Sequence, residues 1–311
     1  MGEYIENVTT SRALVPIRKV IVAVVMAASA LGGTLVAESR QLARAHDRYQ
    51  QGDFLGAIKL LKGSDALDAE GLLLAGQAQY RAGNIRVACD FFERAVAANP
   101  ASSRYVHWLG RAYGRRAESA NVLLAPKYAV LARQNFEEAV RLDPKNLEAW
   151  NDLFVHYLDA PRFLGGGVDK AAAVADRVAG LDAAEYHSDR ARLAEKQRQP
   201  RLAEHHYRMA VELAPRDPGH LIDLAEFLES RGRAEAADRV FDRAHEIAPS
   251  APVVLYEQAR TYVQSARRLD DARALLIRYL STNPGPDDPP RSEALKLLKR
   301  LPSVSVVDPA K

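Results

Sequence analysis

Small and bulky apolar residues recur along this chain every 34 residues, with polar positions between them. In the stretch 69–100, the eighth, twentieth and twenty-seventh places hold the small residues Gly76, Ala88 and Ala95, and the twenty-fourth holds the bulky Phe92. Later stretches repeat these places with Ala203, Tyr207, Ala210 and Pro215, and then with Ala237, Phe241, Ala244 and Pro249. The period predicts a chain built from one unit used many times.

Each unit is expected to form two antiparallel helices. Small residues let two helix backbones approach closely, and a bulky residue at the twenty-fourth place fills the space between them. Proline ends each second helix, because it has no amide hydrogen and forces the preceding residue out of helical geometry. This fits Asn99-Pro100, Asp143-Pro144 and Ala248-Pro249. Strand patterns are missing from the sequence, so the chain is expected to be all-α.

This spacing of residues resembles the tetratricopeptide repeat. The resemblance implies a right-handed superhelical solenoid of antiparallel helix pairs over residues 38–301, with about six to seven repeats. After the proline-rich stretch 284–290, the pattern predicts a capping helix over Ser292–Leu301, with Leu295, Leu298 and Leu301 along its apolar stripe. Residues 302–311 show no helical period and are expected to be a flexible tail.

Two units are longer than the others. One carries extra residues around Ala117–Lys127, where we expect a lengthened hairpin, and the next carries extra residues in Pro161–Gly167. Insertions in repeat proteins form loops on one face, which is often a binding face. The glycines at 165–167 lack the lysine and hydroxyl residue of a phosphate-binding loop, so this stretch is expected to be a loop that opens the next helix.

Ahead of the repeats, residues 1–37 have the layout of an export signal. Arg18 and Lys19 precede the apolar segment Val20–Ala37, which contains the possible cleavage sequence Ala28-Ser29-Ala30. Cleavage there would leave a mature chain that starts near Leu31 and is periplasmic or exported. The alternative is an uncleaved anchor in the inner membrane over residues 20–37, which is long enough to span a bilayer.

Composition argues against several other classes of function. Charged residues make up 27% of the chain but the net charge is only +3, so no nucleic-acid partner is expected. Cys89 is the single cysteine and cannot form an intramolecular disulfide. No metal-binding, haem-binding or nucleophile motif occurs, so we expect no catalytic residue, metal or cofactor. An enzyme with its site at the loop 161–167 remains a remote alternative.

The resemblance implies a ligand groove lined by the first helix of each unit, at its second, fifth, ninth, twelfth and thirteenth places. The partner is expected to be a protein or peptide. The third unit is basic at these places, and acidic residues in the partner would match it because Arg side chains suit carboxylates. The membrane is expected to be contacted only through the N-terminal segment. The candidate groove residues are Tyr80, Arg81, Arg104, His107, Arg111, Arg115, Asn151 and Arg192.

The sequence therefore predicts a non-enzymatic scaffold of the bacterial cell envelope that holds an extended peptide or a partner protein in its concave groove. The alternative is a scaffold for polysaccharide export or envelope assembly, in which the groove contacts sugar chains. Aromatic residues facing the groove would favour it, and the candidates are Tyr80, Trp108 and Tyr256.

Overall fold

A computed structural model describes residues 39–62, 67–286 and 288–302, and all regular secondary structure in these ranges is helical. The apolar segment and cleavage sequence of the N-terminus, and all but the first residue of the expected C-terminal tail, lie outside the described residues. None of the described helices combines the length and the apolar character needed to cross a membrane.

Consecutive helices form antiparallel pairs, as the period predicts. The first pair is the helical stretch 39–50 with α2 (Phe54–Leu61), and α15 (Arg291–Arg300) closes the C-terminal end as a cap. The pairs between them are α3 (Ala69–Arg81) with α4 (Ile85–Ala98), α5 (Ser103–Ser119) with α6 (Ala125–Leu142), α7 (Leu147–Asp159) with α8 (Val168–Val178), α9 (Ala183–Lys196) with α10 (Pro200–Leu213), α11 (Pro218–Ser230) with α12 (Ala234–Ile247), and α13 (Pro252–Gln264) with α14 (Leu269–Ser281). The all-α solenoid is confirmed.

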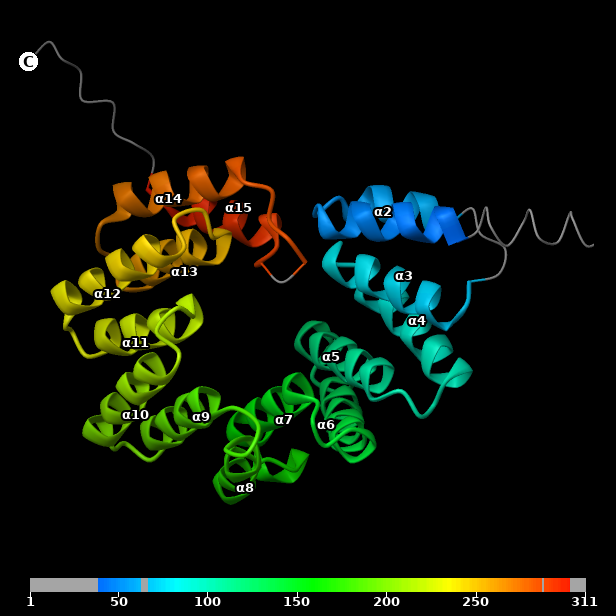
Figure 1. Cartoon of the computed structure of the whole chain (residues 1–311), viewed down its shortest axis with the longest axis horizontal. Coiled ribbons are helices and arrows are strands. Elements are labelled where there is room, and N and C mark those ends of the chain that lie inside the picture. The colour runs from blue at the N-terminus through cyan, green and yellow to red at the C-terminus, as the bar shows by residue number, and fades with distance from the viewer. Residues whose placement is uncertain (1–38, 63–66, 287, 303–311) are drawn as a thin grey trace, which may run out of the picture.

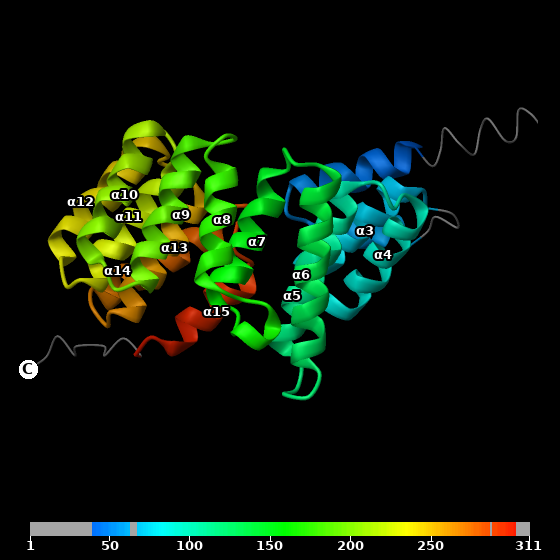
Figure 2. The ribbon, with the colours of Figure 1, turned by 90° about the horizontal axis from the view of Figure 1, so that it is seen from below.

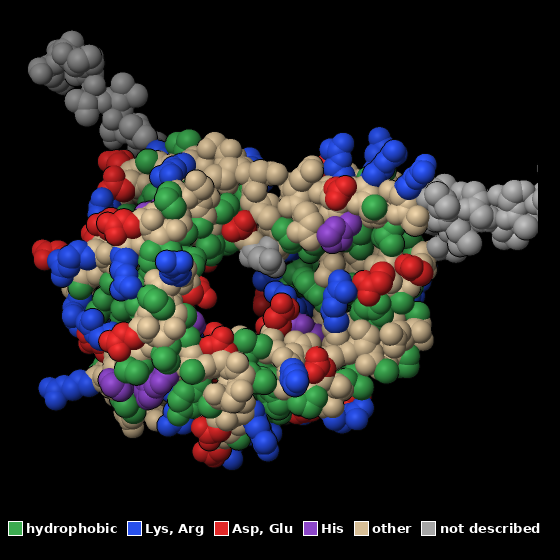
Figure 3. Space-filling model, viewed as in Figure 1, with side chains coloured by type: hydrophobic (Ala, Val, Ile, Leu, Met, Phe, Trp, Pro, Cys, Tyr) green, Lys and Arg blue, Asp and Glu red, His purple; other side chains and the backbone are tan. Residues whose placement is uncertain are grey.

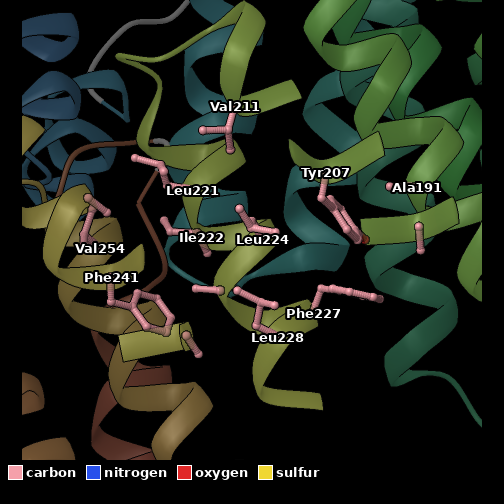
Figure 4. Packing of buried hydrophobic residues seen from close by; sticks show 14 of the residues in the cluster. Ala191, Tyr207, Val211, Leu221, Ile222, Leu224, Phe227, Leu228, Phe241 and Val254 are labelled. Carbon is pink, nitrogen blue, oxygen red and sulfur yellow. The ribbon is translucent and has the colours of Figure 1, made fainter. Parts of the chain in front are cut away.

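Small and bulky residues meet inside each pair. A Cβ atom added at Gly110 of α5 would lie 2.7 Å from the ring of Phe136 on α6, so only glycine allows this approach. The fourth unit reverses the two roles, because Phe154 occupies the eighth place while Ala175 occupies the twenty-fourth, and both are fully buried in one core cluster. The same type of packing continues across the later pairs, where Phe241 and Leu228 belong to one cluster (Figure 4).

The first insertion lengthens the hairpin, as predicted, through its two helices and not through a long loop. It extends both helices, so that α5 has 17 residues and α6 has 18, and only residues 120–124 join them. Figure 2 shows the α5–α6 hairpin projecting past its neighbours. The second insertion forms the 3-10 helix η1 (Arg162–Leu164), which packs against α6. The extra residues become helix because 119–136 contains no helix-breaking residue except Pro126, which sits in the first turn of α6 where proline is tolerated.

The capping helix forms as expected, but with a different buried face. Ala294, Leu297 and Leu301 are buried, whereas Leu295 is 48% exposed and Leu298 is only partly buried. Of the predicted leucine stripe, only Leu295 was placed on the wrong face. The small Ala294 is buried instead, which allows α15 to lie close to its neighbours in the solenoid.

The solenoid curves until its two ends meet. The odd-numbered helices α3 to α13 line the inside of a ring around a central opening, and the even-numbered helices α4 to α14 lie outside (Figure 1). Gly52, in the turn before α2, has φ of +73°, and a Cβ atom there would overlap the carbonyl oxygen of Pro284, which follows α14. First and last units are thus in contact through backbone atoms.

Candidate functional site

Polar N-cap residues fix where most of the odd-numbered helices begin, and these helices form the inner surface. Asp68, Ser102, Asn146, Asp182 and Asp217 each accept a hydrogen bond from a backbone N–H of the first turn. These caps satisfy amide groups that have no partner within the helix. Because each inner helix starts at the same point of the repeat, the same places of each unit face the opening.

The first hollow of this surface, which we call the α5–α7 hollow, has a volume of about 540 Å³. It brings together three side chains that the sequence placed in the groove, Tyr80, Arg111 and Arg115. Asp152 and Val155 of α7 face them, and Pro161 and Leu164 from the second insertion complete the wall. An inserted stretch therefore does border the predicted groove, at the unit where the sequence is basic.

The predicted basic stripe of α5 is paired with carboxylates of the same chain. His107 Nε2 lies 2.7 Å from Asp152 Oδ2, and Arg111 Nε lies 3.6 Å from the same oxygen. The Arg111 guanidinium also stacks over the Trp108 ring, 4.7 Å from its centroid. Asp152 therefore contacts two of the four basic residues of this stripe.

The other two members of the stripe have acidic neighbours of their own. Arg104 contacts Glu70 at 3.1 Å, and Arg115 contacts Glu118 at 2.7 Å. The expectation that all four side chains are exposed is wrong for His107, which is only 1% exposed. It is buried because its ring packs beside Phe136 of α6 while Asp152 covers its polar edge.

The remaining predicted groove residues divide between the surface and the core. Arg192 is partly exposed and stacks over Phe154 at 5.5 Å, whereas the Oδ1 atom of Asn151 is buried without a hydrogen-bond partner. Arg81 lies near Tyr279 of α14, next to the closing contact of the ring; burial raises the pKa of that tyrosine and the Arg81 charge opposes the rise. Further groove places are filled by buried residues, namely Leu73, Gln77, Ser188, Ile222 and Tyr256.

The aromatic side chains proposed for sugar contacts are mostly withdrawn from the inner surface. Trp108 is 8% exposed and Tyr256 is 7% exposed, while Tyr80 is partly buried and packs edge-on against Trp108. Stacking on a sugar ring requires an accessible aromatic face. Of the three candidates, Tyr80 lines the α5–α7 hollow.

A second hollow, the α9–α11 hollow, has a volume of about 730 Å³ and adjoins the first, because Asp159 lines both. Its charged lining comes from the inner helices α7, α9 and α11. Its carboxylates are Asp159, Glu195, Asp223 and Glu226, and its cations are Arg192 and Lys196.

The sequence reasoning missed the acidic residues of the inner surface. Asp152, Asp189, Asp223 and Glu257 all stand at the sixth place of their repeat units, one place after the position that the family pattern identified. Burial raises the pKa of Asp189 to about 8, that of Asp223 to about 6 and, despite the nearby Arg260, that of Glu226 to about 7. The signal was present in the sequence, since an Asp or Glu recurs at the same place of four successive units.

The arrangement is suited to binding. Among the described residues, no three His, Cys, Asp or Glu side chains come together as a metal-ion site. The thiol of Cys89 is buried in the core of its unit, and burial raises its pKa, which disfavours the reactive thiolate. What the inner surface offers a ligand is a curved series of charged and polar side chains bordered by two hollows.

Comparisons with known proteins agree with this architecture. The family model described as tetratricopeptide repeat matches residues 42–103 and 188–252. A tetratricopeptide repeat protein from Parabacteroides merdae is 14% identical, with a TM-score of 0.56 over 84% of this chain and 97% of its own. A thermophilic protein of the same kind from Thermus thermophilus is 23% identical, with a TM-score of 0.51 over 61% of this chain and 98% of its own. No curated protein matches the sequence. At these identities the two structures support the fold alone.

Proposed function

This chain belongs to the tetratricopeptide-repeat family, and from that premise we propose that it is a non-enzymatic scaffold that binds an extended segment of a partner protein along its inner surface. The observation that carries the proposal is the continuity of the α5–α7 and α9–α11 hollows, which follow the inside of the ring and share Asp159. Repeat solenoids use such concave surfaces for recognition because each unit adds a few side chains to one long surface.

Closure of the ring favours an extended segment over a folded domain. The contact between Gly52 and Pro284 encloses the inner surface, so a ligand must be narrow enough to lie within the opening. An extended chain presents side chains at regular intervals and can contact several inner helices at once. A folded partner would instead reach the outer helices.

We also propose that the protein acts in the bacterial cell envelope. This rests on the sequence of residues 1–37, with its basic flank, apolar segment and Ala28-Ser29-Ala30. N-terminal sequencing of the protein isolated from its source tests it: a mature chain starting near Leu31 is expected in the exported fraction. An intact N-terminus on a membrane-bound protein would support the anchor, and an intact N-terminus on a cytoplasmic protein would contradict export.

Site-specific photo-crosslinking tests the scaffold function. A photoreactive amino acid is placed at Val155 in the α5–α7 hollow or at Gln264 in the α9–α11 hollow, and crosslinking is carried out in cells. A matched outer position is Ile277 on α14, which is 57% exposed. We expect both inner positions to capture the same partner, with mass spectrometry locating the crosslinks in one unbranched segment of its sequence.

Two results would contradict the scaffold proposal. Capture of the partner from Ile277 but from neither inner position would place the interface on the outside of the ring. Crosslinks from the inner positions to surface residues scattered over a folded domain would exclude an extended segment. The acidic partner predicted for α5 is tested separately by the variant Arg111→Glu/Arg115→Glu, which should abolish capture from Val155 if those cations bind it.

A further inference from the structure

Carboxylates occupy the same place on four successive inner helices. Asp152 on α7, Asp189 on α9, Asp223 on α11 and Glu257 on α13 are the sixth residues of their units, and they follow the inside of the ring. Figure 3 shows acidic side chains around much of the central opening. We call these four residues the acidic ladder.

Three members of the ladder are partly exposed, and each of them has a cation nearby. Asp152 binds His107 and Arg111 of the preceding inner helix. Glu257 accepts a hydrogen bond from Arg260, and the Arg192 charge acts on Asp223. At each of these three positions a cationic residue from the fifth or ninth place of an inner helix offsets the carboxylate, so the chain supplies its own counter-ion.

Asp189 differs from the other three members by its burial and not by the lack of a nearby cation, because the Arg192 charge acts on it as well. Its side chain is 1% exposed, and its Oδ2 atom is buried without a hydrogen-bond partner. The places on α7 that correspond to His107 and Arg111 are occupied by Asn151 and Val155, and neither is a cation. The Oδ1 atom of Asn151 is likewise buried without a partner. When Asp189 is ionised, both groups are acceptors without a donor, and a buried acceptor without a donor is costly.

The surroundings of Asp189 are acidic as well. Glu185, Arg192 and Asp223 are the charged groups that act on its carboxyl group, so two of its three charged neighbours are carboxylates. The adjacent α9–α11 hollow adds Asp159, Glu195 and Glu226, of which Asp159 and Glu195 have side chains 60% and 32% exposed. Lys196 pairs with Asp159, Arg231 with Glu195 and Arg260 with Glu226. The carboxylates around Asp189 still outnumber these cations and Arg192.

We propose that the inner surface from α7 to α13 binds a partner segment that carries Lys or Arg, with one such side chain donating to Asp189 and Asn151 and others lying against the α9–α11 hollow. This rests on the proposed function and adds the charge of the partner. Charge-assisted hydrogen bonds from ammonium or guanidinium groups are stronger than neutral ones, and they match the unsatisfied acceptors. The segment would therefore be basic along α7–α13, in contrast to the acidic partner predicted for α5.

The protonation of Asp189 supplies a second readout. Burial and the neighbouring Glu185 raise its pKa to about 8, so in the free protein the carboxyl group holds a proton at neutral pH. A bound cation favours the ionised form and displaces that proton. Calorimetry in two buffers with different ionisation enthalpies should therefore detect proton release on binding at pH 7. Asp189→Asn should reduce this release, and the rest comes from Glu226 and Asp223, whose pKa values are raised to about 7 and about 6.

The direct test uses three labelled synthetic peptides of equal length, in which Gly-Ser spacers alternate with Lys, Glu or Ser. We expect the lysine peptide to bind the full chain with an affinity that falls as salt rises, while the glutamate and serine peptides bind weakly. The variant Asp223→Asn/Glu226→Gln should weaken binding of the lysine peptide at least about tenfold, because it removes two carboxylates of the α9–α11 hollow.

The matched control is Asp242→Asn/Glu246→Gln on the outer helix α12, where both side chains are exposed. It makes the same change in net charge and should leave binding unchanged. Equal loss of binding in the two variants would show that only the overall charge of the protein matters, and it would overturn the proposal. Equal affinity for the lysine and serine peptides would also overturn it. If inner-surface crosslinking captures a partner whose bound segment has no Lys or Arg, the scaffold function stands and the basic partner is wrong.

Discussion

At the scale of single residues, the contact between the eighth and twenty-fourth places can be tested by the same substitution at two glycines that lie one helical turn apart on α5. Gly110→Ala should destabilise the protein by about 1–3 kcal/mol, because the new Cβ atom meets the Phe136 ring at 2.7 Å. The control Gly114→Ala in the same helix should stabilise it by about 0.5–1 kcal/mol through helix propensity, since only Ala132 lies near, at 4.0 Å. Chemical denaturation measures both, and equal effects would contradict the assigned packing.

A pair of histidines on α9 and α10 predicts how stability depends on pH. His187 Nδ1 and His206 Nδ1 lie 2.9 Å apart, and burial together with the neighbouring His187 and His205 lowers the pKa of His206 to about 4. The unfolded chain binds a proton at this residue near pH 6.5, whereas the folded chain does not until about pH 4. Stability should therefore fall as pH drops through this window.

His206→Gln removes this titration, so the slope of unfolding free energy against pH between 6.5 and 4 should become smaller. Urea melts at several pH values measure the slope. His187→Gln provides a comparison, because it removes one of the charges that His206 must face when protonated and should also reduce the slope. An unchanged slope in both variants would show that the two histidines do not cause the pH dependence of stability.

At the scale of elements, one arginine of the last unit binds both helices of the unit before it. Arg267, in the turn between α13 and α14, forms hydrogen bonds of 2.5–3.0 Å with Glu229 of α11 and Asp238 of α12. Hydrogen bonds from Arg267 lower the pKa of Glu229, whose side chain is 8% exposed. The part of stability that this pair contributes is present above the unfolded pKa of Glu and is lost as pH falls through the folded one.

Arg267→Met should destabilise the protein by about 2–4 kcal/mol, because it leaves Glu229 buried without its counter-ion. The exposed pair Arg208–Glu204 on α10 gives a control, since Arg208→Met should change stability by less than about 1 kcal/mol. Thermal and urea melts at pH 7 compare the two. Equal losses would mean that burial of Glu229 does not decide the effect. Because stacking is between neighbours, hydrogen exchange should increase first in α11 to α15.

At the scale of the whole molecule, two glycine substitutions can distinguish the loss of the ring-closing contact from the effect of backbone strain. Gly52 and Gly83 both follow a helix with positive φ, of +73° and +83°, but a Cβ atom at Gly83 has no neighbour within 4 Å. Gly52→Ala should therefore open the contact with Pro284 and increase the radius of gyration in small-angle scattering, while helicity stays unchanged. Gly83→Ala introduces similar strain and should leave the radius as it is. An unchanged radius in both variants would contradict a closed ring in solution.

The sequence by itself determined the helix pairs, their number and their internal packing, because each depends on residues within one unit or its neighbour. The recurrence of small and bulky residues predicted the contact between Gly110 and Phe136, and proline predicted where helices end. The length of the α5–α6 helices and the buried face of α15 were predicted less well, since local patterns leave several helical registers possible.

Only the tertiary structure decided which groove residues have partners and whether the ends of the solenoid meet. The arginines of α5 were predicted at the inner surface, but the pairing of Arg104 with Glu70 and of Arg111 with Asp152 depends on contacts between units that the family pattern does not specify. The burial of Asp189 and the contact of Gly52 with Pro284 arise in the same way. Small rotations between neighbouring helix pairs add up along the chain. The curvature of the ring therefore depends on all units together and cannot be predicted from the sequence of any single unit.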